Sequence, residues 1–368
     1  MNRRDFARLS TLWLATGALP RTAARTTKQA EVARSFPFPP GLGPVDAHAH
    51  LFNPAPASYE MLNRLDLRIV NICVMAPRHG PLEFQQKLAL EILRGSQGRA
   101  VWCSTFDPSR WESPNFAEET ITLLDETFKN GAVAVKIWKN IGMKVKSRAG
   151  KYLMPDDPVF DPIYDLLETR NKTLIAHIAE PPAAWLPPDP SSFEDYTNAP
   201  EWQMYRYPDS PSRQALLAAR DQILKRHPKL RVVGCHLGSM EENVDEIAKR
   251  FDLYPNFAVD VSARLQYLMI QPREKVRAFL IKYHDRILYG TDIGISSTEQ
   301  AEEQLKVWQE VLAHDWKFFA TDEMFDGELH YLGREFREFR GLALPRPVLR
   351  KIYHENAVRW VPGVVSSK

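Results

Sequence analysis

Six side chains that could bind a metal or move a proton stand at or near the ends of apolar, strand-like runs. They are His48, His50, Lys136, His177, His236 and Asp292. Imidazole nitrogen and carboxylate oxygen are ligands for zinc, and they also suit manganese, iron and cobalt. A single histidine on an apolar strand usually has a structural role, but four of the ten histidines in this chain follow the pattern. The pattern therefore predicts a divalent metal site of one or two ions, with zinc as the first choice.

The elements that carry these side chains are eight short apolar runs, each followed by an amphipathic segment. The runs cover residues 44–50, 67–76, 100–107, 132–138, 173–178, 231–236, 256–262 and 287–292. Near-continuous apolar strands that alternate with helices are typical of a parallel sheet buried on both faces. Eight such units predict an α/β fold, a (β/α)8 TIM barrel, with a long loop after strand 5. The active sites of this fold lie at the carboxyl ends of its strands, so the six side chains would meet at one rim.

The segments between and after the strands read as helices with one apolar face. The predicted helices cover residues 116–129, 162–169, 213–226, 241–251, 273–284, 299–319 and 345–361. The last of them would close the C-terminal end of the barrel.

Alternation along the strands predicts which side chains share a face. Asp46, His48 and His50 should lie together on one face of the first strand. On the sixth strand His236 should face the interior, and Cys235 should point away from it, towards the helices. The chain has three cysteines, and all of them lie in apolar runs. This position indicates buried thiols and not a disulfide framework.

The composition and the N-terminus limit the remaining possibilities. The 368 residues carry a formal net charge of +2, which gives no support for nucleic-acid binding. No apolar run reaches the roughly 18 residues that a stable membrane span requires. The start of the chain, with Arg3, Arg4 and Phe6 before a short apolar stretch, resembles a twin-arginine export signal. It predicts a periplasmic or secreted protein that meets the export machinery transiently, whereas without the signal the protein would be cytoplasmic.

The predicted organisation has four parts. They are a signal over 1–24, a linker over 25–42, a metal-dependent hydrolase barrel over 43–363 and a tail over 364–368.

The ordered set of motifs resembles the amidohydrolase superfamily. His-Ala-His at 48–50, single histidines at the ends of strands 5 and 6, and Gly-Thr-Asp at 290–292 carry the resemblance. The segment 341–359 is similar to the closing helix of the amidohydrolase-related branch of the superfamily. The resemblance extends over residues 43–363 and implies a barrel hydrolase or decarboxylase with one or two divalent metal ions.

The resemblance also implies a role for each of the six side chains. The buried metal would be held by His48, His50, His177 and Asp292. His236 would bind a second metal or hydrogen-bond to the substrate carbonyl. Lys136 would be carboxylated and bridge two metals, as in binuclear members of the superfamily. Alternatively, Lys136 would remain a cation that pairs with Asp46, Glu180, Asp292 or a substrate carboxylate.

Two reactions are open to such a centre. A divalent metal lowers the pKa of its bound water, so Asp292 could accept a proton from the water and return it to the leaving group. His236 would help to polarise the scissile carbonyl. This predicts a metal-dependent hydrolase of a C–O or C–N bond in a lactone, ester or amide. The alternative is a non-oxidative decarboxylase on the same site, and a barrel that binds metal or ligand without turnover is the least favoured.

The loops at the same rim indicate a small, anionic substrate. Arg264, just after strand 7, can pair bidentately with a carboxylate, and Trp138 and Lys139 follow strand 4. Glu180, three residues past His177, would act as a second acid–base group or as a partner of that histidine. The expected partner is therefore a small molecule, and a homo-oligomer is compatible with the sequence.

Overall fold

The computed structural model describes residues 38–189, 196, 199–295, 300–326 and 338–365. The predicted signal over 1–24, most of the predicted linker and residues 366–368 of the tail lie outside these ranges. The export signal and the domain boundaries therefore stay predictions. Among the described helices, none combines the length and the apolarity that crossing a membrane requires.

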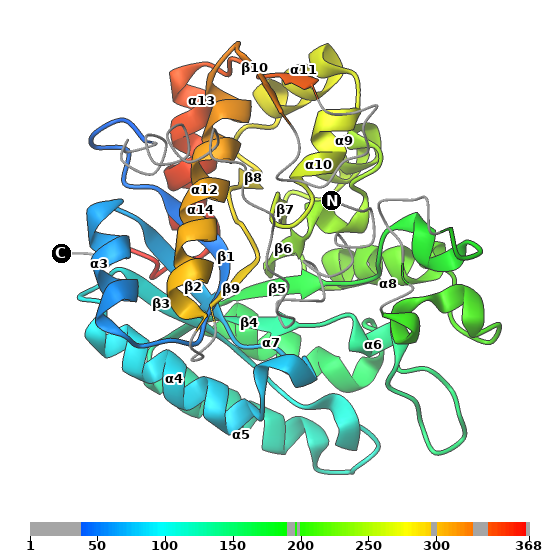
Figure 1. The fold of residues 1–368 in the computed structure, drawn as a ribbon. Helices are drawn as coiled ribbons and strands as arrows, with labels where there is room; N and C mark the ends of the chain where they lie inside the picture. Colours follow the sequence, from blue (N-terminus) through cyan, green and yellow to red (C-terminus); the bar gives the residue numbers. More distant parts are fainter. Residues whose placement is uncertain (1–37, 190–195, 197–198, 296–299, 327–337, 366–368) are drawn as a thin grey trace.

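One curled parallel sheet forms the centre of a mixed α/β fold (Figure 1). Its strands are β1 (Val45–Leu51), β2 (Arg68–Ile72), β3 (Ala100–Thr105), β4 (Ala132–Ile137), β5 (Thr173–His177), β6 (Arg231–Cys235), β7 (Phe257–Asp260), β8 (Ile287–Leu288) and β9 (Ile293–Ile295). They pair in the order β8-β7-β6-β5-β4-β3-β2-β1-β9. Because the two edge strands β8 and β9 follow each other in the chain, the sheet is consistent with a TIM-like barrel. The first seven predicted strands are confirmed, most of them shorter than predicted.

The eighth predicted strand, 287–292, is wrong from Tyr289 onward, because the chain leaves the sheet between β8 and β9. There the backbone N–H groups bond elsewhere: Tyr289 donates to the carbonyl of Ile352 at 2.9 Å, and Asp292 donates to the carbonyl of His48 at 2.7 Å. Asp292 also has a φ of 62°, a left-handed conformation that a continuous strand does not contain. The break places the Asp292 carboxylate beside the end of β1.

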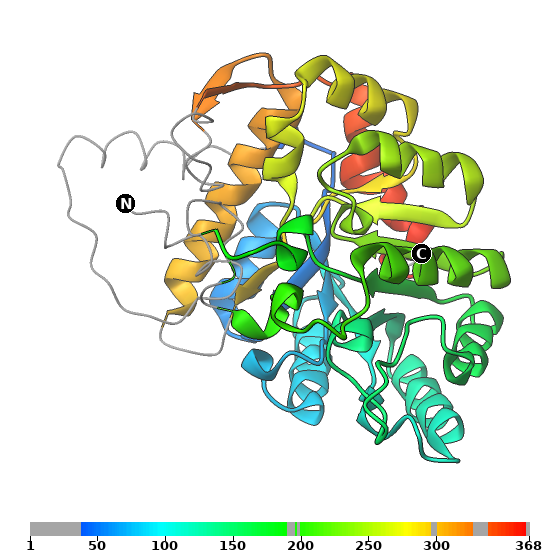
Figure 2. The same cartoon turned by 90° about the vertical axis from the view of Figure 1, so that its right-hand side faces the viewer.

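Helices connect the strands and surround the sheet (Figure 1). They are α3 (Pro56–Arg64), α4 (Leu82–Gly95), α5 (Phe116–Lys129), α6 (Asn140–Met143), α7 (Asp161–Thr169), α8 (Arg213–Arg226), α9 (Val244–Leu253), α10 (Leu265–Ile270), α11 (Arg273–Lys282), α12 (Ala301–Ala320), α13 (Arg346–Arg350) and α14 (Asn356–Trp360). Helices α5 and α8 begin and end where the sequence predicts. Helix α12 runs along one side of the sheet, next to β1 and β9 (Figure 2). The segment 345–361 contains α13 and α14, joined by a single π-helical turn at Lys351–Glu355.

Two further parts of the chain lie outside the repeating pattern. Between β5 and α8, short 3-10 turns occur at Pro182–Trp185, Pro200–Trp202 and Met204–Arg206. After α12, β10 (Met324–Asp326) pairs antiparallel with β11 (Glu338–Arg340).

Alternation predicted that Asp46 shares a face with His48 and His50, and this prediction is wrong. Asp46 instead connects β1 to the broken eighth strand and to α12. Its carboxylate accepts hydrogen bonds from the Thr291 backbone at 3.0 Å, the Thr291 hydroxyl at 2.5 Å and the Trp308 indole at 3.1 Å. It also accepts a bond from the backbone of His48 at 3.0 Å. The pairing of β1 with β2 changes register between Asp46 and Ala49, and this irregularity breaks the two-residue alternation.

We expect Asp46→Ala to lower the free energy of unfolding by about 3 kcal/mol or more, because it leaves four buried donors without an acceptor. Urea denaturation measures the change. Asp46→Asn, which keeps one acceptor oxygen, should lose less stability than Asp46→Ala. An Asp46→Ala protein as stable as the unsubstituted chain would contradict the role given to this carboxylate.

A cluster of buried side chains fills the inner side of the curled sheet. Every strand from β1 to β8 contributes to it, and α14 adds Ala357 and Trp360. Cys235 belongs to this inner cluster, so the prediction that its side chain points towards the outer helices is wrong. Strand β6 ends at Cys235, and strand alternation therefore does not extend to the following His236. The thiol and the imidazole both lie on the inner side.

Candidate metal centre

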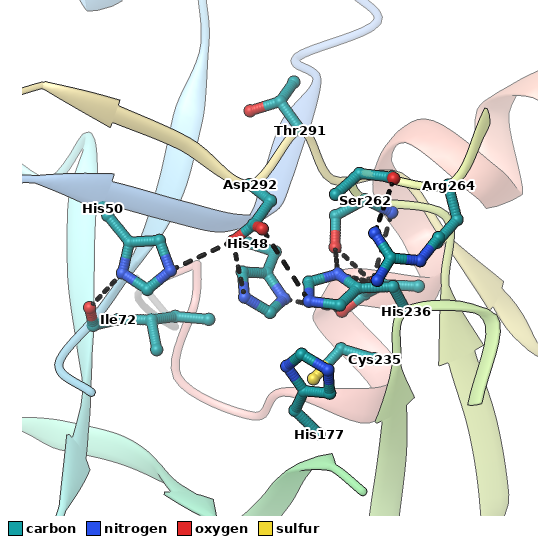
Figure 3. A network of polar contacts seen from close by, with 12 residues as sticks. His48, His50, Ile72, His177, Cys235, His236, Ser262, Arg264, Thr291 and Asp292 are labelled. Carbon is teal, nitrogen blue, oxygen red and sulfur yellow. Dashed lines mark hydrogen bonds and ion pairs between the residues drawn. The ribbon is translucent and has the colours of Figure 1, made fainter. Parts of the chain in front are cut away.

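Three of the predicted ligands present nitrogen and oxygen atoms to one another at the carboxyl ends of β1 and β8 (Figure 3). The Nε2 atoms of His48 and His50 lie 3.3 Å and 3.1 Å from Oδ1 of Asp292. Nε2 of His236 lies 3.8 Å from Oδ2 of the same carboxylate. His48, His50 and Asp292 form one group whose ligand atoms all lie within 4.8 Å of one another. The structure therefore brings His48, His50 and Asp292 together.

The other ring nitrogens of the two β1 histidines are already engaged. Nδ1 of His48 lies 2.9 Å from the Asp260 carboxylate, and Nδ1 of His50 lies 2.7 Å from the carbonyl oxygen of Ile72. Both partners are acceptors, so each Nδ1 must carry the hydrogen. Both Nε2 atoms are thereby left to face Asp292 as potential ligands. This orientation by outer partners is typical of histidines that bind metals.

His177 and His236 form the opposite side of the centre. Their ring centroids are 4.7 Å apart, and the rings meet edge to face. Both side chains are buried, and burial holds the pKa of each imidazole well below its ordinary value. The two rings are therefore neutral at neutral pH, which is the form that binds a metal.

The carboxylate of Asp292 is ionised in this environment. Burial by itself would raise its pKa. Electrostatic attraction to His236, the hydrogen bond with His50 and electrostatic attraction to His48 together hold the pKa well below the ordinary range. Burial also lowers the pKa of His50. An ionised carboxylate beside the neutral imidazoles of His50, His177 and His236 is a fitting donor set for a divalent cation.

His48 is the exception among the four histidines. Burial and the charge of Lys136 act to lower its pKa, but Asp260 and Cys235 outweigh them and raise it to about 10. Without a metal, His48 therefore keeps a second proton, and a metal must displace it. Metal affinity should accordingly fall as the pH falls.

Asp260 and Ser262, at the end of β7, belong to the centre although the sequence analysis did not select them. Asp260 contacts His48 through one oxygen and accepts the Ser262 hydroxyl at 2.5 Å through the other. The Ser262 hydroxyl lies 2.7 Å from Nδ1 of His236. One carboxylate thus orients two histidines from different strands. The sequence signal for both residues is their position, because they are polar residues at the end of the apolar run 256–262.

His79 is a third residue near the centre that no sequence pattern singled out. It lies in the turn Pro77–His79 after β2, and its ring stacks on His50 with centroids 5.0 Å apart and an interplanar angle of 15°. The ring of Phe52 lies 5.0 Å from it on another side. His79 therefore packs on the side of the centre formed by β1 and β2.

Lys136 lies beneath the histidines and is 1% exposed. Its Nζ atom is 2.8 Å from Sγ of Cys235 and 3.3 Å from Nε2 of His48. In the described part of the chain, its contacts are thus with a thiol and a ring. They are not ion pairs with Asp46, Glu180 or Asp292, which the sequence analysis left open.

The predicted substrate-binding residues converge on a single buried carboxylate, that of Glu180. Lys139 donates to one oxygen of Glu180, and Nη2 of Arg264 lies 3.5 Å from the other. The Tyr196 hydroxyl donates to the same carboxylate at 2.9 Å, and Nε2 of His177 lies 3.8 Å from it. Two cations against one carboxylate leave one positive charge beside the centre.

Trp138, the remaining predicted substrate-binding residue, packs against the segment that follows β5. Its ring meets that of Trp202 edge to face at 4.9 Å. The ammonium groups of Lys139 and Lys144 each lie 4.3 Å from the Trp202 centroid. Trp138 therefore helps to join the loops after β4 and β5. The contact described here is with Trp202 and not with a histidine of the centre.

A buried carboxyl near Arg264 gives the fold a pH-dependent stability. Glu241 is fully buried, neither of its carboxyl oxygens has a hydrogen-bond partner, and burial raises its pKa from 4.5 to about 7. A raised pKa in the folded state stabilises the protein at low pH. This contribution is lost as the pH rises through about 7.

When the pH rises from about 5 to about 8, we expect the unsubstituted protein to lose about 3 kcal/mol more stability than Glu241→Gln loses, since the glutamine does not ionise. Urea denaturation at the two pH values measures the difference. Glu126→Gln, at an exposed position of α5, is the matched control and should keep the pH dependence of the unsubstituted protein. Parallel pH profiles for the unsubstituted chain and Glu241→Gln would contradict the expectation.

A curled parallel sheet with histidines and an aspartate at its carboxyl rim is typical of metal-dependent barrel enzymes. Residues 45–363 match the family described as amidohydrolase, so the chain belongs to the amidohydrolase family. Members of this family are enzymes that use a divalent metal, and they include hydrolases and decarboxylases. No curated protein sequence matches the chain.

Several solved structures are similar to this chain at low sequence identity. A protein described as amidohydrolase II has 13% identity and a TM-score of 0.50, with 86% of this chain and 99% of that chain covered. The 2,6-dihydroxybenzoate decarboxylase from Rhizobium has 13% identity and a TM-score of 0.49, over 86% of this chain and 98% of that chain. A candidate 2-pyrone-4,6-dicarboxylic acid hydrolase from Pseudomonas putida has 13% identity and a TM-score of 0.49, over 88% and 99%.

Proposed function

We propose that the protein is a metal-dependent hydrolase that cleaves a C–O or C–N bond of a small anionic molecule, at the rim of a (β/α)8 barrel. The observation that carries the proposal is the orientation of His48 and His50. Each has its Nδ1 engaged by an outer acceptor and its Nε2 turned towards the Asp292 carboxylate. Membership of the amidohydrolase family supports it.

The residues present fit a divalent metal, with zinc as the first choice because imidazole and carboxylate are its common ligands. The metal would be held by His48, His50, His177 and Asp292. We assign a single ion, since Nζ of Lys136 is already in contact with Cys235 and His48. Held there, a divalent metal supplies Lewis-acid chemistry, polarising a carbonyl and making water more acidic.

The residues of the chain supply the remaining chemistry of hydrolysis. Asp292 is ionised and partly exposed, so its carboxylate can take a proton from the attacking water and return it to the leaving group. His236 is held through Ser262, whose hydroxyl donates to Asp260, so Nδ1 of the neutral ring carries the hydrogen. Its Nε2, which faces the Asp292 carboxylate, is therefore placed to accept a hydrogen bond from the attacking water. His48 and His50 stay in place through their Nδ1 bonds during the reaction.

The charge beside the centre defines the substrate class. Arg264 and Lys139 share one carboxylate, Glu180, so one positive charge remains for the substrate. A monoanionic carboxylic acid bearing a lactone, ester or amide suits this charge. The guanidinium of Arg264, on the loop after β7, is the group we assign to its carboxylate.

The test separates hydrolysis from decarboxylation on the same protein. Chelator-treated protein is assayed with and without added Zn²⁺ or Mn²⁺ on a panel of aromatic and cyclic carboxylic acids with lactone, ester and amide groups. We expect release of a new acid or amine only when metal is restored. Release of carbon dioxide would identify a lyase instead. Turnover by the chelator-treated protein without added metal would contradict a metal-dependent reaction.

A further inference from the structure

The end of β6 adds a second set of possible metal ligands to the floor of the centre. His48, Cys235 and His236 offer ligand atoms that all lie within 4.8 Å of one another. Cys235 is a free, fully buried thiol, and Figure 3 shows it beside the histidine rings. A thiolate combined with imidazoles selects thiophilic ions, whereas carboxylate oxygen suits harder ones such as manganese. The floor of the centre therefore differs in ligand chemistry from the side formed by His50 and Asp292.

Lys136 occupies the space that an ion bound to this second set would need. An ion held by Cys235 and His48 lies about 2.3 Å from sulfur and about 2.1 Å from nitrogen. Nζ of Lys136 lies 2.8 Å from that sulfur and 3.3 Å from that nitrogen. An ion at those distances from the sulfur and the nitrogen would need the space that Nζ occupies. The amine and a metal on Cys235 are therefore mutually exclusive.

We propose that Lys136 is a specificity-determining residue. Its side-chain amine fills the position that a cation bound by His48, Cys235 and His236 would take, and it keeps thiophilic metals off the thiol. The bound metal is thereby confined to the side of His50 and Asp292. When Lys136 is replaced, an ion binds Cys235 and the thiol proton leaves to solvent, so that Sγ becomes a thiolate ligand. The inference rests on the proposed function, because it assumes a metal beside Asp292.

Cobalt substitution tests the proposal, because a thiolate bound to Co²⁺ gives a near-ultraviolet charge-transfer absorption that histidine and carboxylate ligands do not give. Metal-free protein is titrated with Co²⁺ as the unsubstituted chain and as Lys136→Ala. We expect visible cobalt bands from both proteins and the charge-transfer absorption from Lys136→Ala alone. Adding Cys235→Ser to Lys136→Ala should abolish that absorption. Adding Cys103→Ser, at another buried thiol of the same inner cluster, should leave it in place.

Two outcomes would overturn the proposal. One is a thiolate absorption in the unsubstituted protein, which would show that Lys136 does not exclude the ion. The other is a folded Lys136→Ala protein that binds cobalt without that absorption. Lys136→Gln keeps most of the side-chain volume without the charge, so it decides the matter if Lys136→Ala does not fold. Absence of any cobalt bands from the unsubstituted protein would instead count against the proposed function itself.

Discussion

Asp292→Asn is expected to lower kcat by about a thousandfold, within the range that removal of a general acid–base group produces. The amide oxygen can still face a metal, but the side chain can no longer accept a proton at neutral pH. The substitution also suits the backbone, because asparagine tolerates the left-handed conformation that Asp292 adopts, with its φ of 62°. Metal content should therefore stay close to that of the unsubstituted protein.

Steady-state kinetics and metal analysis of the same preparations give the two readouts. Asp285→Asn makes the same chemical change at a surface aspartate that pairs with Arg359, and it should leave both values unchanged. An Asp292→Asn enzyme that retains most of its kcat would remove Asp292 from proton transfer. Full loss of metal would show that its main role is that of a ligand.

Asp260→Asn is expected to weaken metal binding by about 10- to 100-fold, although Asp260 touches no metal in the proposed centre. The carboxylate uses one oxygen for Nδ1 of His48 and the other for Ser262. Asparagine has a single acceptor oxygen, so its NH2 group must face one of these donors. If it faces His48, the ring changes tautomer and its Nε2 carries the hydrogen, which takes the lone pair away from the metal.

Competition with a chelator of known affinity measures the loss. Ser262→Ala is the matched comparison, because it removes the contact with His236 and leaves the bond between Asp260 and His48 in place. We expect Ser262→Ala to bind metal nearly as tightly as the unsubstituted protein. Equal affinities for Asp260→Asn and the unsubstituted protein would mean that this carboxylate does not orient the ligand.

The positions of most elements follow from local patterns in the sequence. Strands buried on both faces are continuous apolar runs, and helices such as α5 and α8 have one apolar face, so the chain records them residue by residue. The eighth strand departs from its pattern because tertiary contacts override it. Its N–H groups bond to Asp46, His48 and Ile352, and none of these partners is visible in the run 287–292.

The centre was predictable where one rule governs it, namely that polar residues end the strands of a barrel. His48, His50 and Asp292 follow that rule and meet as predicted. Cys235 did not follow, because the alternation of faces stops where β6 ends. The carboxylate of Glu180 was predicted as an acid–base group or as a partner of His177, but only the folded chain shows it between Lys139 and Arg264.

The most direct test of the account is an anomalous-difference map from crystals of the protein grown with Zn²⁺, recorded at the zinc absorption edge. The account predicts one strong peak per chain, within ligand distance of His48, His50, His177 and Asp292. A peak bound elsewhere, a second peak of equal height against Lys136, or a centre without a peak would contradict it.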